Sequence, residues 1–144
     1  MYNKGAGILF TNVEFGNNFA TSGGGFTFIL NSAWRSSNLF SNIDLKNNYA
    51  ILGGGIYFLP PRVNIGDANQ LPLFYDTLIE NNFAEYGGGI YIEASVTPPH
   101  FTSPTILRNN TAQRMGGGLF INSISNDSWM SDAEFSNKYV FHFY

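Results

Sequence analysis

The chain has 144 residues, a formal net charge of −3, no cysteine, and charged side chains at only 12% of its positions. The length suits one domain, residues 1–144, and the acidic balance argues against nucleic acid, whose phosphates need a basic surface. Without cysteine there is no disulfide or thiolate metal site, and no apolar run approaches the about 18–20 residues of a membrane span. We expect no cofactor.

A repeat accounts for the unusual content of 16 Gly and 18 Asn. An Asn pair comes first in each copy, at Asn17 and Asn18, Asn47 and Asn48, Asn81 and Asn82, and Asn109 and Asn110. A glycine triplet follows, at Gly23, Gly24 and Gly25, Gly53, Gly54 and Gly55, Gly87, Gly88 and Gly89, and Gly116, Gly117 and Gly118. A fifth half-copy has Asn137 and Lys138 in the place of the pair. Four such copies indicate a solenoid.

Each copy offers about three short strands. The first covers residues such as Phe10 to Asn12, the second ends at the Asn pair, and the third follows the glycines, with apolar residues two apart. The position two before the pair is apolar throughout: Phe15, Leu45, Ile79, Leu107 and Phe135. The position after the pair is mostly aromatic: Phe19, Tyr49, Phe83, Thr111 and Tyr139.

One such unit cannot bury its apolar face, so the units must stack. Short strands, Gly/Asn turns and this period predict an all-β parallel β-helix of about 4–5 rungs with 28–34 residues each. The rungs are residues 13–42, 43–76, 77–104 and 105–132, with partial rungs at 1–12 and 133–144. Identical positions would then form axial columns. The Asn amides are expected to bond along the stack, and the glycines to make corners with positive φ or close backbone approach. The segments 29–42, 59–76 and 93–104 vary in length and are expected to be loops.

These motifs resemble the FxxN and GGA[ILV] repeats of the chlamydial polymorphic membrane proteins. FxxN stands at Phe15–Asn18, with Leu, Ile and Leu replacing Phe in the next three copies, and Gly replaces Ala in the third place of each triplet. The resemblance covers residues 13–140. It implies a right-handed β-helix of the pectin-lyase-like type, a location outside the cell or on its surface, and an adhesive role.

Some residues suggest ligand chemistry. A phosphate loop is disfavoured because no Lys-Ser/Thr follows a triplet and each triplet leads into a strand. Glu14 and Asp44 share an outward column and could act as an acid–base pair, although Lys46 beside Asp44 would neutralise it. Tyr57 and Tyr91 belong to an outward aromatic column that could bind sugars. His100 and His142 have no carboxylate or Ser at a repeated offset, so neither is expected to be a catalytic base.

The sequence favours a non-enzymatic structural or adhesive segment of a larger surface or filament-forming β-helix protein. We expect no capping element at either end, and hence partners that are further rungs of the same or another chain, or host or matrix glycans and proteins. The alternative is a secreted polysaccharide lyase, glycoside hydrolase or glycan-binding module. Its site would lie at Glu14, Asp44, Tyr57 and Tyr91.

Overall fold

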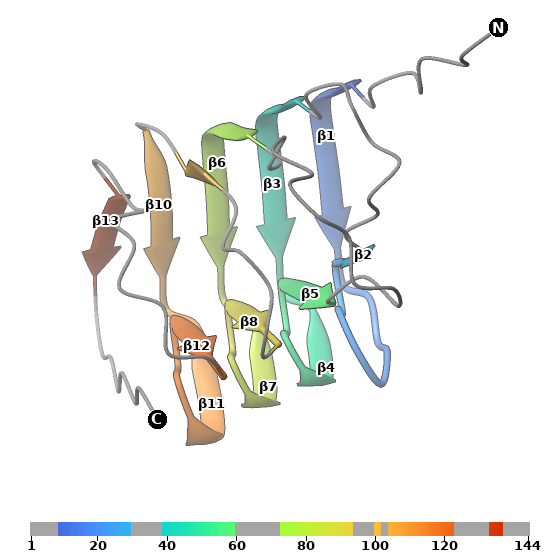
Figure 1. The fold of residues 1–144 in the computed structure, drawn as a ribbon, viewed down its shortest axis with the longest axis vertical. Helices are drawn as coiled ribbons and strands as arrows, with labels where there is room; N and C mark the ends of the chain where they lie inside the picture. Colours follow the sequence, from blue (N-terminus) through green and yellow to red (C-terminus); the bar gives the residue numbers. More distant parts are fainter. Residues whose placement is uncertain are drawn as a thin grey trace, which may run out of the picture.

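The fold is a solenoid of stacked rungs, and the equivalent strands of successive rungs pair to form three parallel sheets. The computed structural model describes residues 9–29, 39–59, 73–93, 100–101, 104–122 and 133–136, and Figure 1 shows its strands running side by side from rung to rung. Every strand pair is parallel and joins equivalent positions of neighbouring repeats, as Leu45 and Ile79 do between β3 and β6. This arrangement confirms the predicted parallel β-helix, with about four rungs.

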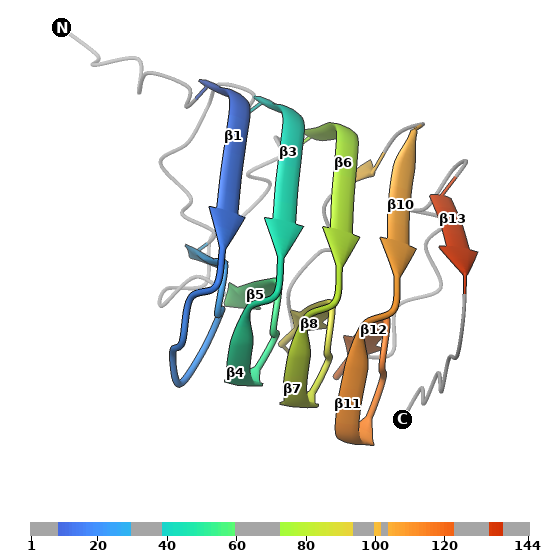
Figure 2. The ribbon, with the colours of Figure 1, turned by 180° about the vertical axis from the view of Figure 1, so that it is seen from behind.

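The three sheets form the faces of the solenoid, and Figure 2 shows them from behind. Sheet A contains β1 (Leu9–Gly16), β3 (Leu39–Lys46), β6 (Leu73–Glu80), β10 (Thr105–Arg108) and β13 (Ala133–Ser136), with β9 (His100–Phe101) beside β6. Sheet B contains β4 (Tyr49–Leu52), β7 (Phe83–Tyr86) and β11 (Thr111–Met115). Sheet C contains β2 (Phe26–Ile29), β5 (Ile56–Leu59), β8 (Ile90–Ile92) and β12 (Leu119–Ile121).

The strands differ from the expectation in two ways. The two short strands expected before each Asn pair form one strand of eight residues in β1, β3 and β6. Asn12, Asn42 and Asp76, in the middle of these strands, have φ of 56°, 54° and 50°. This left-handed residue resets the alternation of side chains, so that Phe10 and Val13, three apart, both pack against the core. The second difference is an additional strand directly after the Asn pair, which makes sheet B.

The fourth rung contains one extra residue. Phe101 pairs with Phe74 and Thr105 with Thr77, so four steps along the chain match three in the rung before. Pro104 lies in this longer segment, and its carbonyl accepts a hydrogen bond from Thr77 N–H at 3.0 Å. The long strand is therefore divided into β9 and β10.

Several expectations lie outside the described residues. They concern most of the loops, including Pro60, Pro61, Pro98 and Pro99, and the C-terminal positions Asn137, Lys138 and His142. Parts of all three expected loops are strand instead, including residues 39–42, 73–76 and 100–101.

The core lies between sheets A and C. Leu45, Ile79 and Leu107 from sheet A are at most 1% exposed, and they belong to one cluster with Phe58 and Ile92 from sheet C. A second interior column consists of stacked rings, with centroids 5.4, 4.6 and 4.9 Å apart along the series Phe10, Phe40, Phe74 and Phe101. Sheet B contributes only small inward residues, of which Ala50 and Ala84 are buried.

The glycine triplets make the corner between sheets B and C. The first glycine of each has positive φ, 60° at Gly23 and 68° at Gly116. The second has no room for a side chain, because a Cβ on Gly88 would collide with the carbonyl oxygen of Thr111 and lie 2.5 Å from that of Gly117. The corner therefore needs both glycine's conformational freedom and its lack of a Cβ.

We predict that Gly88→Ala destabilises the protein by about 3 kcal/mol, because rigid backbone of the next rung must move. The matched control is Gly16→Ala, whose Cβ would lie 3.1 Å from the mobile carboxylate of Glu14 and 3.6 Å from a backbone oxygen. The control should change the free energy of unfolding by no more than about 0.5 kcal/mol. Urea denaturation measures both, and equal effects would contradict the steric explanation.

Candidate functional site: the axial ladders and the outer faces

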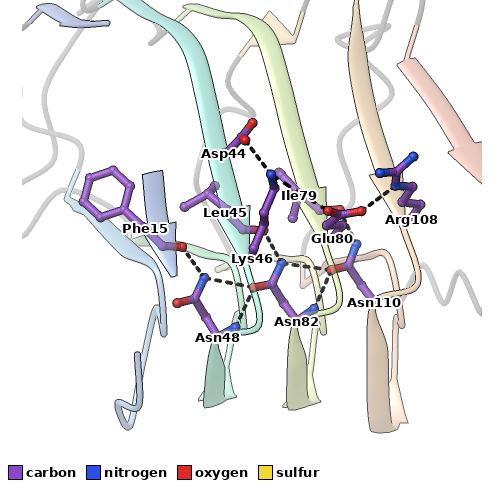
Figure 3. Close-up of polar contacts among 10 residues, drawn as sticks. All are labelled: Phe15, Asp44, Leu45, Lys46, Asn48, Ile79, Glu80, Asn82, Arg108 and Asn110. Carbon is purple, nitrogen blue, oxygen red and sulfur yellow. Dashed lines mark hydrogen bonds and ion pairs between the residues drawn. The ribbon is translucent and has the colours of Figure 1, made fainter. Parts of the chain in front are cut away.

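The second Asn of each pair belongs to a hydrogen-bonded ladder, and Figure 3 shows its members Asn48, Asn82 and Asn110. Asn48 donates from its backbone N–H and from Nδ2 to Oδ1 of Asn82, at 2.9 and 3.0 Å. Asn82 makes the same two bonds to Oδ1 of Asn110, both at 3.0 Å, and Asn18 makes them to Asn48. The structure thus shows amide bonding along the stack, for this column.

Each interior side-chain amide also donates a hydrogen bond to a backbone carbonyl of the preceding rung. Nδ2 of Asn82 donates to the carbonyl of Leu45 at 2.8 Å, and the amides of Asn48 and Asn110 bond likewise to Phe15 and Ile79. Asn48 and Asn82 are 1% exposed. Both protons of their Nδ2 and both lone pairs of their Oδ1 are engaged, so no polar capacity is left unsatisfied.

The first Asn of each pair has a different role. Asn17, Asn47, Asn81 and Asn109 have φ between 54° and 59°, and their side chains are exposed. They make the left-handed corner between sheets A and B, a conformation that Asn tolerates better than most residues. The expectation of bonded amides therefore does not hold for this column.

The glycine and Asn motifs meet across the solenoid. A Cβ added to Gly25, Gly55 or Gly89 would lie 3.0, 3.3 or 3.1 Å from the Nδ2 of the Asn in the next rung. The third glycine of the triplet therefore leaves the space that the amide ladder occupies. This contact explains why the two motifs occur together in every copy.

The outward face of sheet A carries an ion-pair ladder. Lys46 Nζ lies 2.6 Å from Asp44 and 4.0 Å from Glu80, which also pairs with Arg108. The hydrogen bond that Lys46 donates to Asp44, together with the negative charges of Asp44, Glu14 and Glu80, raises the pKa of Lys46 despite some desolvation. Exposed pairs of this kind contribute little to stability.

Glu14 and Asp44 are neighbours in the register of β1 and β3, as expected. They line an open hollow of about 190 Å³ with Asn12, Val13 and Asn42. Among the described residues, no three His, Cys, Asp or Glu side chains are grouped closely enough to hold a metal ion. Asp44, but not Glu14, is ion-paired with Lys46 among the described residues.

Tyr57 and Tyr91 point outward from sheet C but are buried, each 6% exposed. With Phe120 they form a second apolar cluster, against which Leu52, Tyr86 and Met115 pack from the other side of the glycine corner. The hypothesis of an exposed sugar-binding platform at Tyr57 and Tyr91 is therefore wrong. The first rung has a polar equivalent, in which Thr27 donates to the carbonyl of Ser22.

The buried tyrosine hydroxyls share a polar network with Glu93. Tyr57 donates to Glu93 Oε2 at 2.8 Å, and Asn122 contacts both Tyr91 and Glu93 at 3.4 Å. Burial, the hydrogen bond to Glu93 and its negative charge raise the pKa of Tyr57. Burial is also the main cause of the raised pKa of Tyr91.

A row of stacked aromatic residues lies on the outer side of sheet B instead. Phe19 and Tyr49 stack with centroids 4.8 Å apart, and Tyr49 stacks on Phe83 at 5.1 Å. Phe19 is 80% exposed and Tyr49 39%. The sequence contained the signal, since the position after the Asn pair is aromatic in three consecutive copies. Exposure could not be assigned to it without knowing that these residues form a strand.

Comparison with known proteins supports the motif assignment. Residues 76–93, which cover the third Asn pair and the third glycine triplet, match the Chlamydia polymorphic membrane protein (Chlamydia_PMP) repeat. No curated protein and no solved structure matches the chain. None of the described residues belongs to a helix with the length and hydropathy that crossing a bilayer requires.

We predict that Asn82→Ala lowers the free energy of unfolding by about 3 kcal/mol or more, because it leaves buried donors of Asn48 and the Leu45 carbonyl without partners. Asn81→Gly is the matched control, since it removes an exposed amide and keeps the positive φ. It should cost less than about 0.5 kcal/mol. Thermal or urea unfolding compares the two, and a loss of similar size in both variants would show that the ladder is not the stabilising element.

The raised pKa of Tyr57 predicts a loss of stability at alkaline pH. A tyrosine of the unfolded chain loses its proton around pH 10.0, whereas folded Tyr57 keeps it. The stabilising contribution is complete below pH 10 and decreases above it, by at most about 1.4 kcal/mol per pH unit. Urea denaturation between pH 8 and 11.5 should give a shallower dependence for Tyr57→Phe, and identical slopes would contradict the prediction.

Proposed function

We propose that this chain is a non-enzymatic structural or adhesive segment of a larger β-helix protein at the cell surface. The polymorphic membrane protein repeat supports a location at the outer membrane or surface. The absence of a free carboxylate pair at Glu14 and Asp44 favours this role over a polysaccharide lyase or hydrolase. The partners proposed for it are further rungs and the glycans or proteins of a host or matrix.

The first described rung carries the proposal, because the described residues satisfy its axial interactions on one side only. Oδ1 of Asn18 accepts no hydrogen bond from the described residues, whereas Oδ1 of Asn48, its counterpart in the next rung, accepts two. Among the described rings, Phe19 stacks on one face only, against Tyr49. Phe15 and Phe26 of the same rung are only half-buried. Elsewhere in the stack, a neighbouring rung of this repeat supplies the hydrogen-bond donors, the second ring contact and the burial that these residues lack within the described part of the chain.

Adding a rung tests the proposal. A second copy of residues 39–72 inserted between Ile8 and Leu9 preserves the register, because Leu9, Leu39 and Leu73 are equivalent positions. We expect a higher melting temperature, by about 2–4 °C for each kcal/mol gained, and a larger urea m-value in a single transition.

The control is the same insertion with Asn48→Ala and Tyr49→Ser in the added copy, which removes its ladder amide and its ring. This control should lose most of the gain. An added rung that unfolds separately, or that leaves the melting temperature unchanged, would contradict the proposal.

A further inference from the structure

Sheet B presents an outer face that the solenoid itself does not need, formed by Asn17, Phe19, Asn47, Tyr49, Asn81 and Phe83. We name these six residues the ring–amide face. The rings of Phe19, Tyr49 and Phe83 are nearly parallel, with interplanar angles of 5° and 13°. The core is filled from the opposite side of the same strands by Ala50 and Ala84. The rings therefore stand on the solvent side, at a cost in exposed apolar surface.

A row of free amides runs beside the rings. The side chains of Asn17, Asn47 and Asn81 are exposed, and within the described part of the chain they make no hydrogen bond. Their backbone is fixed by the left-handed corner, so the amides are held one rung apart. Such preorganised groups lose little conformational freedom when a ligand binds.

The chemistry of this face selects an uncharged ligand with many hydroxyl groups. None of its six residues is charged, and the nearby Glu85 is already paired with Arg114. The amides and the Tyr49 hydroxyl can both donate and accept hydrogen bonds. The rings stack face to face along the solenoid, so their positive edges are directed outward, toward the ligand's oxygens.

The face by itself is small compared with a protein interface. Strands of four residues extend about 13 Å, and three rungs add about 10 Å, at 3.3 Å per residue and 4.8 Å per strand. A stable protein interface needs about 800 Å² on each partner, several times this area. A short oligosaccharide matches it.

We propose that the ring–amide face binds a neutral oligosaccharide. This inference rests on the proposed adhesive function and names its ligand class. It places the ligand on sheet B, on residues other than the tyrosines of the buried cluster.

The test is calorimetric titration of the full chain with chitohexaose, cellohexaose and maltohexaose, and with a sulfated heparin hexasaccharide as the charged comparison. We expect at least one neutral hexasaccharide to bind, with no binding of the sulfated one. Phe19→Ser combined with Tyr49→Ser should weaken binding at least tenfold while the melting temperature stays within a few degrees. Asn47→Gly keeps the corner and removes one amide, so it should weaken binding by a smaller factor.

Tyr75→Ser is the matched control, because Tyr75 is 48% exposed on the outer face of sheet A. It should bind like the wild type. The proposal is overturned if no neutral hexasaccharide binds, if the double variant binds as well as the wild type, or if these residues instead mediate self-association in sedimentation velocity. If an added rung stabilises the protein but no saccharide binds, the proposed structural role is supported and only the saccharide site is ruled out.

Discussion

The buried amide ladder is the interaction on which the other features of the solenoid depend. An Asn that donates twice to the next rung and once to the preceding one fixes the axial spacing and the register together. It requires a left-handed residue just before it, so that the chain turns from sheet A while the amide points inward, and Asn81 supplies this at φ 55°. It also requires an opposing wall without side chains, which Gly55 supplies for Asn82. The two motifs of the repeat are thus two sides of one polar contact in an otherwise apolar interior, where an unmade hydrogen bond is costly.

The three outer faces have different properties, although the same ladders lie behind them. Sheet A carries alternating charges that pair with one another, as Lys46, Glu80 and Arg108 do. Sheet C carries rings that pack against residues across the glycine corner and are withdrawn from solvent. Only sheet B combines exposed rings with amides that have no partner among the described residues. A ligand that meets this solenoid therefore finds satisfied charges on one face, buried rings on another and available groups on the third.

Sequence reasoning succeeded where a residue's surroundings repeat with the sequence. Leu45 and Ile79 are buried because the same column is apolar in every rung, and the column itself can be read from the repeat. Prediction from the sequence failed where a residue's surroundings depend on the backbone conformation at a bend or corner of the rung. The left-handed residue at Asn42 joins two expected strands into β3, and no spacing of apolar residues reveals that joint. Tyr57 was expected to be exposed because it points away from the core, yet Leu52 and its equivalents close over this column from the neighbouring face.

Variation among the four copies separates structural columns from the rest. The inward positions hardly change: Asn, Gly and Ala recur in each copy at the ladder, the corner and sheet B. Outward positions of sheet A vary from copy to copy, and one column reads Gly16, Lys46, Glu80 and Arg108. The ring column of sheet B is outward and exposed, yet it is aromatic in three consecutive copies. Ring stacking alone does not explain this, because the interior column of Phe40 and Phe74 gains the same stacking, worth about 0.5–1.5 kcal/mol per pair, without exposing apolar surface. The aromatic column of sheet C is kept by its packing against neighbouring side chains, whereas the exposed ring column of sheet B has no such cover among the described residues, and contact with a ligand explains it better than the stability of the stack.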